Sequence, residues 1–264
     1  MPSANDFCVI SERRTSGWWV IVTRGAVLSE ARGERDEMAE RVNDLLLPIV
    51  KGYGSERSWT LLGTESLQTF GGSGFLQEYP IEQYVRDAKI DTLYEGTTAI
   101  QGQDLFFRKI VKDQAAALGF LAGEVEKFLK AEGGNGRLKV ERELLATALE
   151  DTNAIVSTMI GHLMSADTSA EGGDLRNIYK VGLNSSRLLM VLGDVVCSWL
   201  LLRQAEIALE KLDAGPSGKD RPFYEGKVAA AQFFAHQVLP KISAERAIAE
   251  SVDLAIMDLS EDAF

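Results

Sequence analysis

Cysteine and histidine are scarce in this sequence, with two of each among 264 residues. Cys8 and Cys197 are far apart and lack CxxC spacing, which argues against a disulfide framework and against a zinc site. His162 and His236 stand alone on expected helices, without a second histidine or a carboxylate at metal-ligand spacing, and we expect both to be ordinary helix residues. The sequence therefore predicts no metal site and fits a reducing, cytoplasmic compartment.

Clustered positive charge is lacking too, since 28 lysines and arginines stand against 39 aspartates and glutamates. A surface that binds nucleic acid needs grouped lysine and arginine, so the composition argues against a nucleic-acid partner. Long hydrophobic runs are also missing. Segment 18–22 is too short to span a bilayer, and the apolar streak 195–202 contains Ser198 and ends at Arg203. We expect no membrane span, and 45% hydrophobic residues are ample for a buried core.

What the sequence does contain is helical periodicity, with apolar residues three and four positions apart from Glu34 onward. The first pattern contains Pro48, where the helix must kink, or end and restart. Ser55 is a plausible N-cap for the next helix. One apolar stripe, typical of a helix packed in an antiparallel bundle, is formed by Leu188, Leu192, Val195, Trp199 and Leu202. We expect an all-α fold of antiparallel helical bundles, with further helices over 55–70, 81–90, 97–130, 138–165, 174–212 and 223–251.

Glycine-rich stretches divide the chain, and the clearest linker is Gly133-Gly-Asn-Gly136. We expect a leader over 1–31, a helical domain over 32–132 and a second helical domain over 137–264. The leader lacks helical period, and its segment 17–23 is strand-like. Its paired tryptophans could form a ligand platform, but a leader unrelated to the rest, from a displaced start or a frameshift, is the favoured interpretation. The acidic end should be a solvated tail.

One region combines glycines, an acid and a helix start, in Gln68-Thr-Phe-Gly-Gly-Ser-Gly-Phe75 and Tyr94-Glu-Gly-Thr97. Glycines let the backbone approach a ligand with no Cβ in the way. Thr97 would offer its hydroxyl to the free amides of the next helix, and those amides with the helix dipole form an anion site. From spacing alone, Glu95 is better interpreted as a capping-box acid than as a catalytic group.

Five linked motifs in this region resemble the C-terminal helical domain of flavin-dependent acyl-CoA dehydrogenases. They are Gln68-x-Phe-Gly-Gly-x-Gly-Phe75, Glu78-Tyr-Pro80, Arg86-Asp-Ala-Lys-Ile90, Tyr94-Glu-Gly-Thr97 and Ile100-Gln101. The later part resembles the extra helical domain of the larger bacterial members, through Trp199–Glu206, Phe223–Lys227 and Ala244–Glu250. The two resemblances cover the chain from about residue 32 to its end. With the neighbouring motifs included, Glu95 is favoured as the position of the family's catalytic base.

The resemblance implies α,β-desaturation of an acyl-CoA thioester in fatty acid β-oxidation, with FAD as cofactor and electron-transfer flavoprotein or a similar acceptor as partner. It implies a homo-oligomer as well. Glu95 would remove the α-proton, which requires a carboxylate in a dry pocket. The backbone amide of Glu95 would stabilise the charge on the thioester oxygen. Gly96 would let the substrate pass close to the backbone.

The resemblance also assigns cofactor contacts. The adenosine diphosphate half of FAD would be reached across a subunit boundary by Gln68, Thr69, Phe70, Gly71 and Gly72. Thr97 would face the flavin of its own subunit, and Gln101 lies in the same helix start. Ala99 stands where many relatives carry a polar residue, so any hydrogen bond made there is absent. We expect Arg86 and Asp87 to be a structural ion pair or cap.

Complete members of this family place a helical N-terminal domain and a middle β-domain before the bundle, where this chain has its leader. We expect the first helices of the bundle to be missing as well. A carboxylate without walls around it is solvated, so we expect an N-terminally truncated form with little activity alone. The alternative is a non-catalytic helical oligomerisation or interaction module derived from the family. Exposed apolar surface would predict dimerisation or aggregation in either case.

Overall fold

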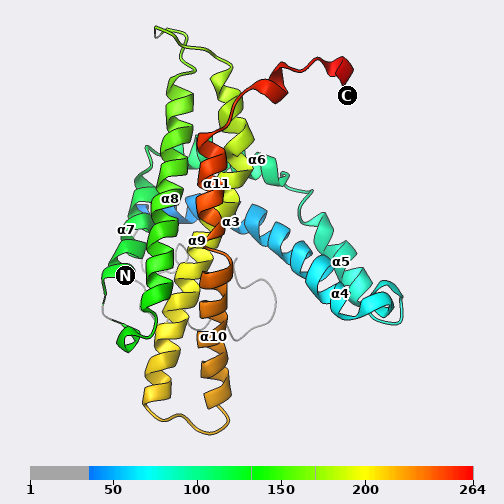
Figure 1. Ribbon diagram of the computed structural model, residues 1–264, viewed down its shortest axis with the longest axis vertical. Helices are drawn as coiled ribbons and strands as arrows, with labels where there is room; N and C mark the ends of the chain where they lie inside the picture. Colours follow the sequence, from blue (N-terminus) through cyan, green and yellow to red (C-terminus); the bar gives the residue numbers. More distant parts are fainter. Residues whose placement is uncertain (1–35, 132, 170, 264) are drawn as a thin grey trace. The chain divides into compact units, whose positions relative to one another are not determined.

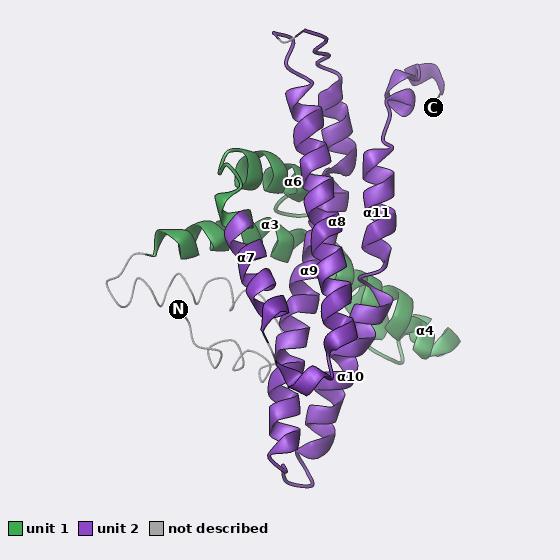
Figure 2. Ribbon diagram, turned by 60° about the vertical axis from the view of Figure 1, so that its left-hand side comes forward, with its two compact units in different colours: residues 1–118 green, residues 119–264 purple. Residues whose placement is uncertain are grey.

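The computed structural model describes residues 36–131, 133–169 and 171–263. These residues form helices and turns and no strand, so the expected all-α fold is confirmed. The strand-like segment and the rest of the leader lie outside the described residues. The chain divides into two compact units, residues 1–118 and 119–264 (Figure 2). This division by packing falls before the glycine linker, and the domain limits expected from the sequence remain predictions.

The described part of unit 1 begins with α3 (Glu37–Thr60), whose N-cap Asp36 accepts a hydrogen bond from the amide of Ala39 at 2.9 Å. The helix continues through Pro48 and through Ser55, so the expected helix start at Ser55 is wrong. The Ser55 hydroxyl instead donates to the carbonyl of Gly52 within the helix. Burial of the α3 face that carries Leu45, Ile49 and Tyr53 stabilises the continuous helix against its proline and glycines.

The helix is prolonged by the π-helical segment η2 (Leu61–Ser66) and by α4 (Leu67–Thr69), and a 3₁₀ turn, η3 (Gly71–Phe75), follows. The next helix, α5 (Ile81–Ile90), begins after Pro80 as expected. Then come α6 (Thr98–Gln103) and the π-helical segment η4 (Asp104–Val111). α3 packs against α5, α6 and η4 and encloses a small core with Leu105, Phe106 and Ile110.

The single helix expected over 97–130 is interrupted, which corrects that prediction. Gln114 and Ala115 adopt φ of 54° and 56°, and α7 (Ala116–Lys130) starts after them. The Asp113 carboxylate accepts a hydrogen bond from the amide of Ala117 at 2.8 Å, as a capping residue does. It is also bound by Arg41 of α3, so a contact distant in sequence ends one helical segment and starts the next.

Unit 2 is an elongated bundle of α8 (Lys139–Met164), α9 (Asn177–Asp213), α10 (Arg221–Gln237) and α11 (Lys241–Glu250). α9 packs against α8 and α10, and α11 packs against α8 (Figure 1). The stripe expected from Leu188 to Leu202 is buried, which confirms that prediction. The single helix expected over 223–251 is wrong, because Pro240 cannot donate a backbone hydrogen bond and occupies the N-cap of α11.

Within the described part of the chain, α9 alone is long and apolar enough to cross a bilayer by composition. The most apolar stretch of α9 is 72% buried inside the bundle, as in a core helix.

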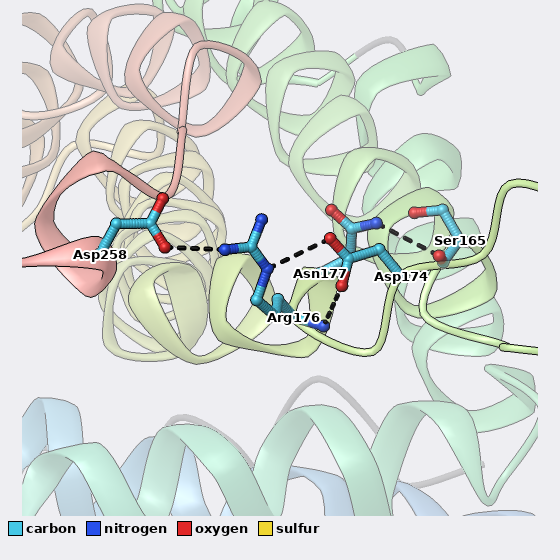
Figure 3. Close-up of polar contacts among 5 residues, drawn as sticks. All are labelled: Ser165, Asp174, Arg176, Asn177 and Asp258. Atoms are coloured by element: carbon cyan, nitrogen blue, oxygen red, sulfur yellow. Dashed lines mark hydrogen bonds and ion pairs between the residues drawn. The ribbon is translucent and has the colours of Figure 1, made fainter.

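An ion pair joins the loop before α9 to the acidic end of the chain (Figure 3). Arg176 binds Asp258 at 2.8 Å and Asp174 at 3.2 Å, so the acidic tail is exposed but tied at Asp258.

Candidate functional site

The turn between α5 and α6 places Glu95 and Gly96 in the left-handed region of backbone space, with φ of 55° and 92°. Glycine adopts such angles freely, whereas a residue with a Cβ loses roughly 1–2 kcal/mol there. A strained residue of this kind persists only where its surroundings hold it. The conformation of Glu95 is therefore imposed by its neighbours.

Gln101 on α6 is one of these neighbours. Its side-chain Nε2 donates to the backbone carbonyl of Glu95 at 2.9 Å. The same side chain crosses Gly96 so closely that a Cβ there would lie 3.0 Å from Nε2 and 3.3 Å from Cγ2 of Ile100. Gly96 is thus required twice, for its positive φ and for this close approach.

Two residues of α3 hold the flanks of the turn. Lys51 Nζ donates to the carbonyl of Asp91 and lies 4.7 Å from the ring centroid of Tyr94. Glu56 Oε1 accepts a hydrogen bond from the Thr98 hydroxyl at 2.6 Å. Sequence reasoning missed both residues, and no local signal marks them, because they come from 40 and 42 positions earlier in the chain.

Negative charge gathers at the turn. The charge of Asp91 is the largest of several effects that raise the pKa of Tyr94; some burial, a hydrogen bond with Asp91 and the charge of Glu95 add to it. The Glu95 side chain is exposed. The described residues thus position this carboxylate without enclosing it.

Thr97 occupies the N-cap of α6, as expected, but its hydroxyl makes no capping hydrogen bond, so the expected use of that hydroxyl is wrong. The side chain is exposed, and its hydroxyl is left available to a ligand. Nor does the Glu95 carboxylate bind an α6 amide within the described part of the chain, which removes support from its interpretation as a capping acid. Neighbouring Thr98 makes the structural contact instead.

The second predicted segment, Gln68–Gly72, exposes its backbone at two glycines. A Cβ on Gly71 or Gly72 would meet no atom within 4 Å. Gly74 differs, since it is buried and a Cβ there would lie 2.6 Å from the carbonyl oxygen of Leu67. The glycine motif therefore contains two glycines with open space beside them and one that packing requires.

The other members of this segment are exposed as well. Gln68 lies at the surface, the Thr69 hydroxyl donates to the carbonyl of Glu65 at 2.7 Å, and the Phe70 ring lies 5.1 Å from that of Tyr79. The segment and the Glu95 turn flank α5 from opposite ends. A helix of this length separates them by about 15 Å. The structure therefore gathers Glu95, Gly96, Thr97 and Gln101 at one turn and keeps Gln68–Gly72 apart.

Arg86 and Asp87 form neither the ion pair nor the cap expected of them, as far as the described residues show, and both are exposed on α5. Adjacent helical residues point in different directions, which explains why they do not meet. His236 does have a carboxylate partner, with Nε2 at 3.1 Å from Oε1 of buried Glu141. Residues 36–131, 133–169 and 171–263 contain no group of three side chains suited to a metal.

Two family profiles match the chain. One, described as acetyl-CoA dehydrogenase C-terminal like, covers residues 121–260. The other, described as acyl-CoA dehydrogenase, C-terminal domain, covers residues 25–108. Together they span both helical units.

Relatives among characterised proteins carry related names. The broad-specificity linear acyl-CoA dehydrogenase FadE5 of Mycobacterium tuberculosis is 54% identical over 239 residues, which are 90% of this chain and 38% of that protein. The 3-methylmercaptopropionyl-CoA dehydrogenase of Ruegeria pomeroyi is 33% identical over 88% of this chain and 36% of its own length. A butyryl-CoA dehydrogenase of Syntrophomonas wolfei is 28% identical over 94% of this chain and 38% of its own length. The chain thus spans less than two fifths of these relatives.

Proposed function

This chain belongs to the acyl-CoA dehydrogenase family, and from that membership we propose that it carries the catalytic turn of an FAD-dependent enzyme that desaturates an acyl-CoA thioester. The observation that carries the proposal is the left-handed Glu95-Gly96 turn, held from α3 and α6. Backbone strain at a residue other than glycine is concentrated at functional sites. In this chain the strained residue is also the acid of the family motif.

Glu95 is the base that removes the α-proton of the thioester. The charge that develops on the thioester oxygen requires a fixed donor. The backbone amide of Glu95 donates no hydrogen bond to any described residue, so it is available for this oxygen. Gly96 keeps the adjacent backbone accessible to substrate.

The residues present fit FAD. Gly71 and Gly72 have open space where a Cβ would stand, and the exposed hydroxyl of Thr97 makes no hydrogen bond to a described residue. We assign Gln68, Thr69, Phe70, Gly71 and Gly72 to the adenosine diphosphate half and Thr97 to the flavin, which when bound accepts hydride from the β-carbon. The length of α5 between these two groups suits contacts with cofactors of two different subunits in a homo-oligomer.

Glu95 is exposed, so the walls that would dry its pocket must come from elsewhere in a complete enzyme. We infer that the chain alone has little activity. The whole enzyme would work in cytoplasmic β-oxidation and pass electrons to electron-transfer flavoprotein or a similar acceptor. The second candidate function is a non-catalytic oligomerisation module. The observation that supports it is that unit 2 has a core of its own, which contains no residue of the turn.

The test is to incubate the purified chain with excess FAD, desalt it, and record its visible absorbance and its oxidation of acyl-CoA. Retained flavin would absorb in the visible range, and we expect Glu95→Gln to abolish the small residual oxidation of the chain, because loss of a general base costs roughly 10²- to 10⁴-fold in rate. The control, Glu171→Gln, alters an exposed acid of unit 2 and should leave oxidation unchanged. A folded, colourless chain would show that the chain alone does not hold flavin, and it would favour the oligomerisation module.

A further inference from the structure

We propose that Gln101 is a positioning residue for Glu95, an inference that rests on the proposed role of Glu95 as the base. The 2.9 Å hydrogen bond from Gln101 Nε2 ends on the carbonyl of Glu95 itself. That carbonyl belongs to the peptide that joins two residues of positive φ. The amide of Gln101 therefore acts at the point where the turn has most freedom.

The freedom comes from Gly96. Glycine accepts both signs of φ, so the peptide between Glu95 and Gly96 can rotate unless its carbonyl is held. Rotation of this peptide changes ψ of Glu95 and φ of Gly96. With ψ outside the left-handed region, a positive φ is sterically closed to a residue with a Cβ, so φ of Glu95 would return to negative values. The direction of its side chain and of its own amide would then change. Both groups serve the proposed reaction, the carboxylate as base and the amide as donor to the thioester oxygen.

The contacts from α3 cannot replace this hydrogen bond. Lys51 holds Asp91 and the ring of Tyr94, and Glu56 holds Thr98, so both act on either side of the strained pair. Among the described residues, Gln101 provides the side-chain hydrogen bond that reaches Glu95. This hydrogen bond uses one N–H of the Gln101 amide, and the cofactor contact expected of Gln101 stays a prediction.

The first experiment compares Gln101→Met, which keeps side-chain length but removes the donor, with Gln103→Met, a change at an exposed glutamine of the same helix. A positive φ brings a residue's amide proton close to its own Hα and gives a strong intraresidue cross-peak in NMR spectra. We expect this cross-peak at Glu95 to be present in the unaltered chain and in Gln103→Met, and to weaken in Gln101→Met. An unchanged cross-peak in Gln101→Met would overturn the proposal.

The second experiment measures acyl-CoA oxidation by the FAD-loaded chain. Misplacement of a reacting group by about 1 Å can cost 10²-fold in rate, so we expect Gln101→Met to lower kcat roughly ten- to a hundredfold with KM changed less than about twofold. An altered turn with unchanged kcat would refute the positioning role. If the unaltered chain oxidises nothing, the proposed function fails for it. The NMR comparison then still decides whether Gln101 sets the conformation of Glu95.

Discussion

Arg41 on α3 binds the carboxylate of Asp113, 72 residues later, with Nε at 2.7 Å and Nη2 at 2.6 Å from Oδ1. Arg41 Nη2 also donates to the Asp113 backbone carbonyl at 3.1 Å. The other carboxylate oxygen accepts from the amide of Ala117. One acid therefore joins α3 to the start of α7, beside the left-handed pair Gln114 and Ala115.

Replacement of this acid should loosen unit 1. Asp113→Asn removes the charge that Arg41 binds, and hydrogen bonds to charged groups contribute roughly 1.5–3 kcal/mol each. We expect the unfolding free energy of unit 1 to fall by about 2 kcal/mol, measured by amide hydrogen exchange in α3 and η4. The control is Asp87→Asn, at an exposed acid without a described partner. Equal exchange in the two variants would contradict the role of Asp113.

The same acid predicts a dependence on pH. Burial opposes its ionisation, but the hydrogen bonds from Ala117 and Arg41 and the charge of Arg41 outweigh burial and lower the pKa of Asp113. A lowered folded pKa gives stability that is present above the unfolded value, about 3.9, and is lost as pH falls through the folded value. The difference in stability between the unaltered chain and Asp113→Asn should be constant near neutral pH and shrink below about pH 4. Hydrogen exchange at several pH values, corrected for intrinsic rates, measures it.

Substitution of the two adjacent threonines at the start of α6 should affect stability to different extents. Thr98→Val removes the 2.6 Å hydrogen bond to Glu56 and should destabilise unit 1 by about 1–2 kcal/mol. Thr97→Val alters an exposed hydroxyl without a cap bond and should change stability by less than about 0.5 kcal/mol. If Thr97 contacts flavin, its variant should instead retain less FAD after desalting. Equal destabilisation by both changes would contradict this division of roles.

Gly133 should not tolerate a side chain. A Cβ there would overlap the carboxylate of Glu206 and lie 2.9 Å from Nη2 of Arg142. Glu206 is bound to Arg142, and burial raises the pKa of Glu206 although Arg142 opposes that shift. We expect Gly133→Ala to displace this acid and destabilise unit 2 by roughly 3 kcal/mol, as the breaking of a buried ion pair does.

The matched control for this change is Gly161→Ala. Gly161 lies within α8, and a Cβ added to it would meet no atom within 4 Å. Alanine is favoured over glycine in helices, so stability should stay the same or rise by up to about 1 kcal/mol. Hydrogen exchange in α8 and α9 provides the comparison. Tolerance of alanine at both glycines would show that Glu206 can relocate freely.

Local sequence patterns predicted much of the fold. The apolar stripe from Leu188 to Leu202 predicted a buried face, and Pro80 predicted the start of α5. The contiguous motif at Glu95 predicted which residues share a turn. These predictions depend on neighbours within a few positions, where periodicity and backbone restriction act directly. Pro240 carried a similar signal for the start of α11, which the expectation of one helix over 223–251 did not use.

The sequence by itself determined that the chain is helical, where its apolar faces lie, and that one acid follows a glycine-rich segment of a known family. Only the tertiary structure decided that α3 continues past Ser55, that the helical chain breaks after Asp113, and that Gln101 binds the backbone of Glu95. The physical reason is distance along the chain. Arg41, Lys51 and Glu56 act on residues 40 to 72 positions away, and no local pattern records such contacts.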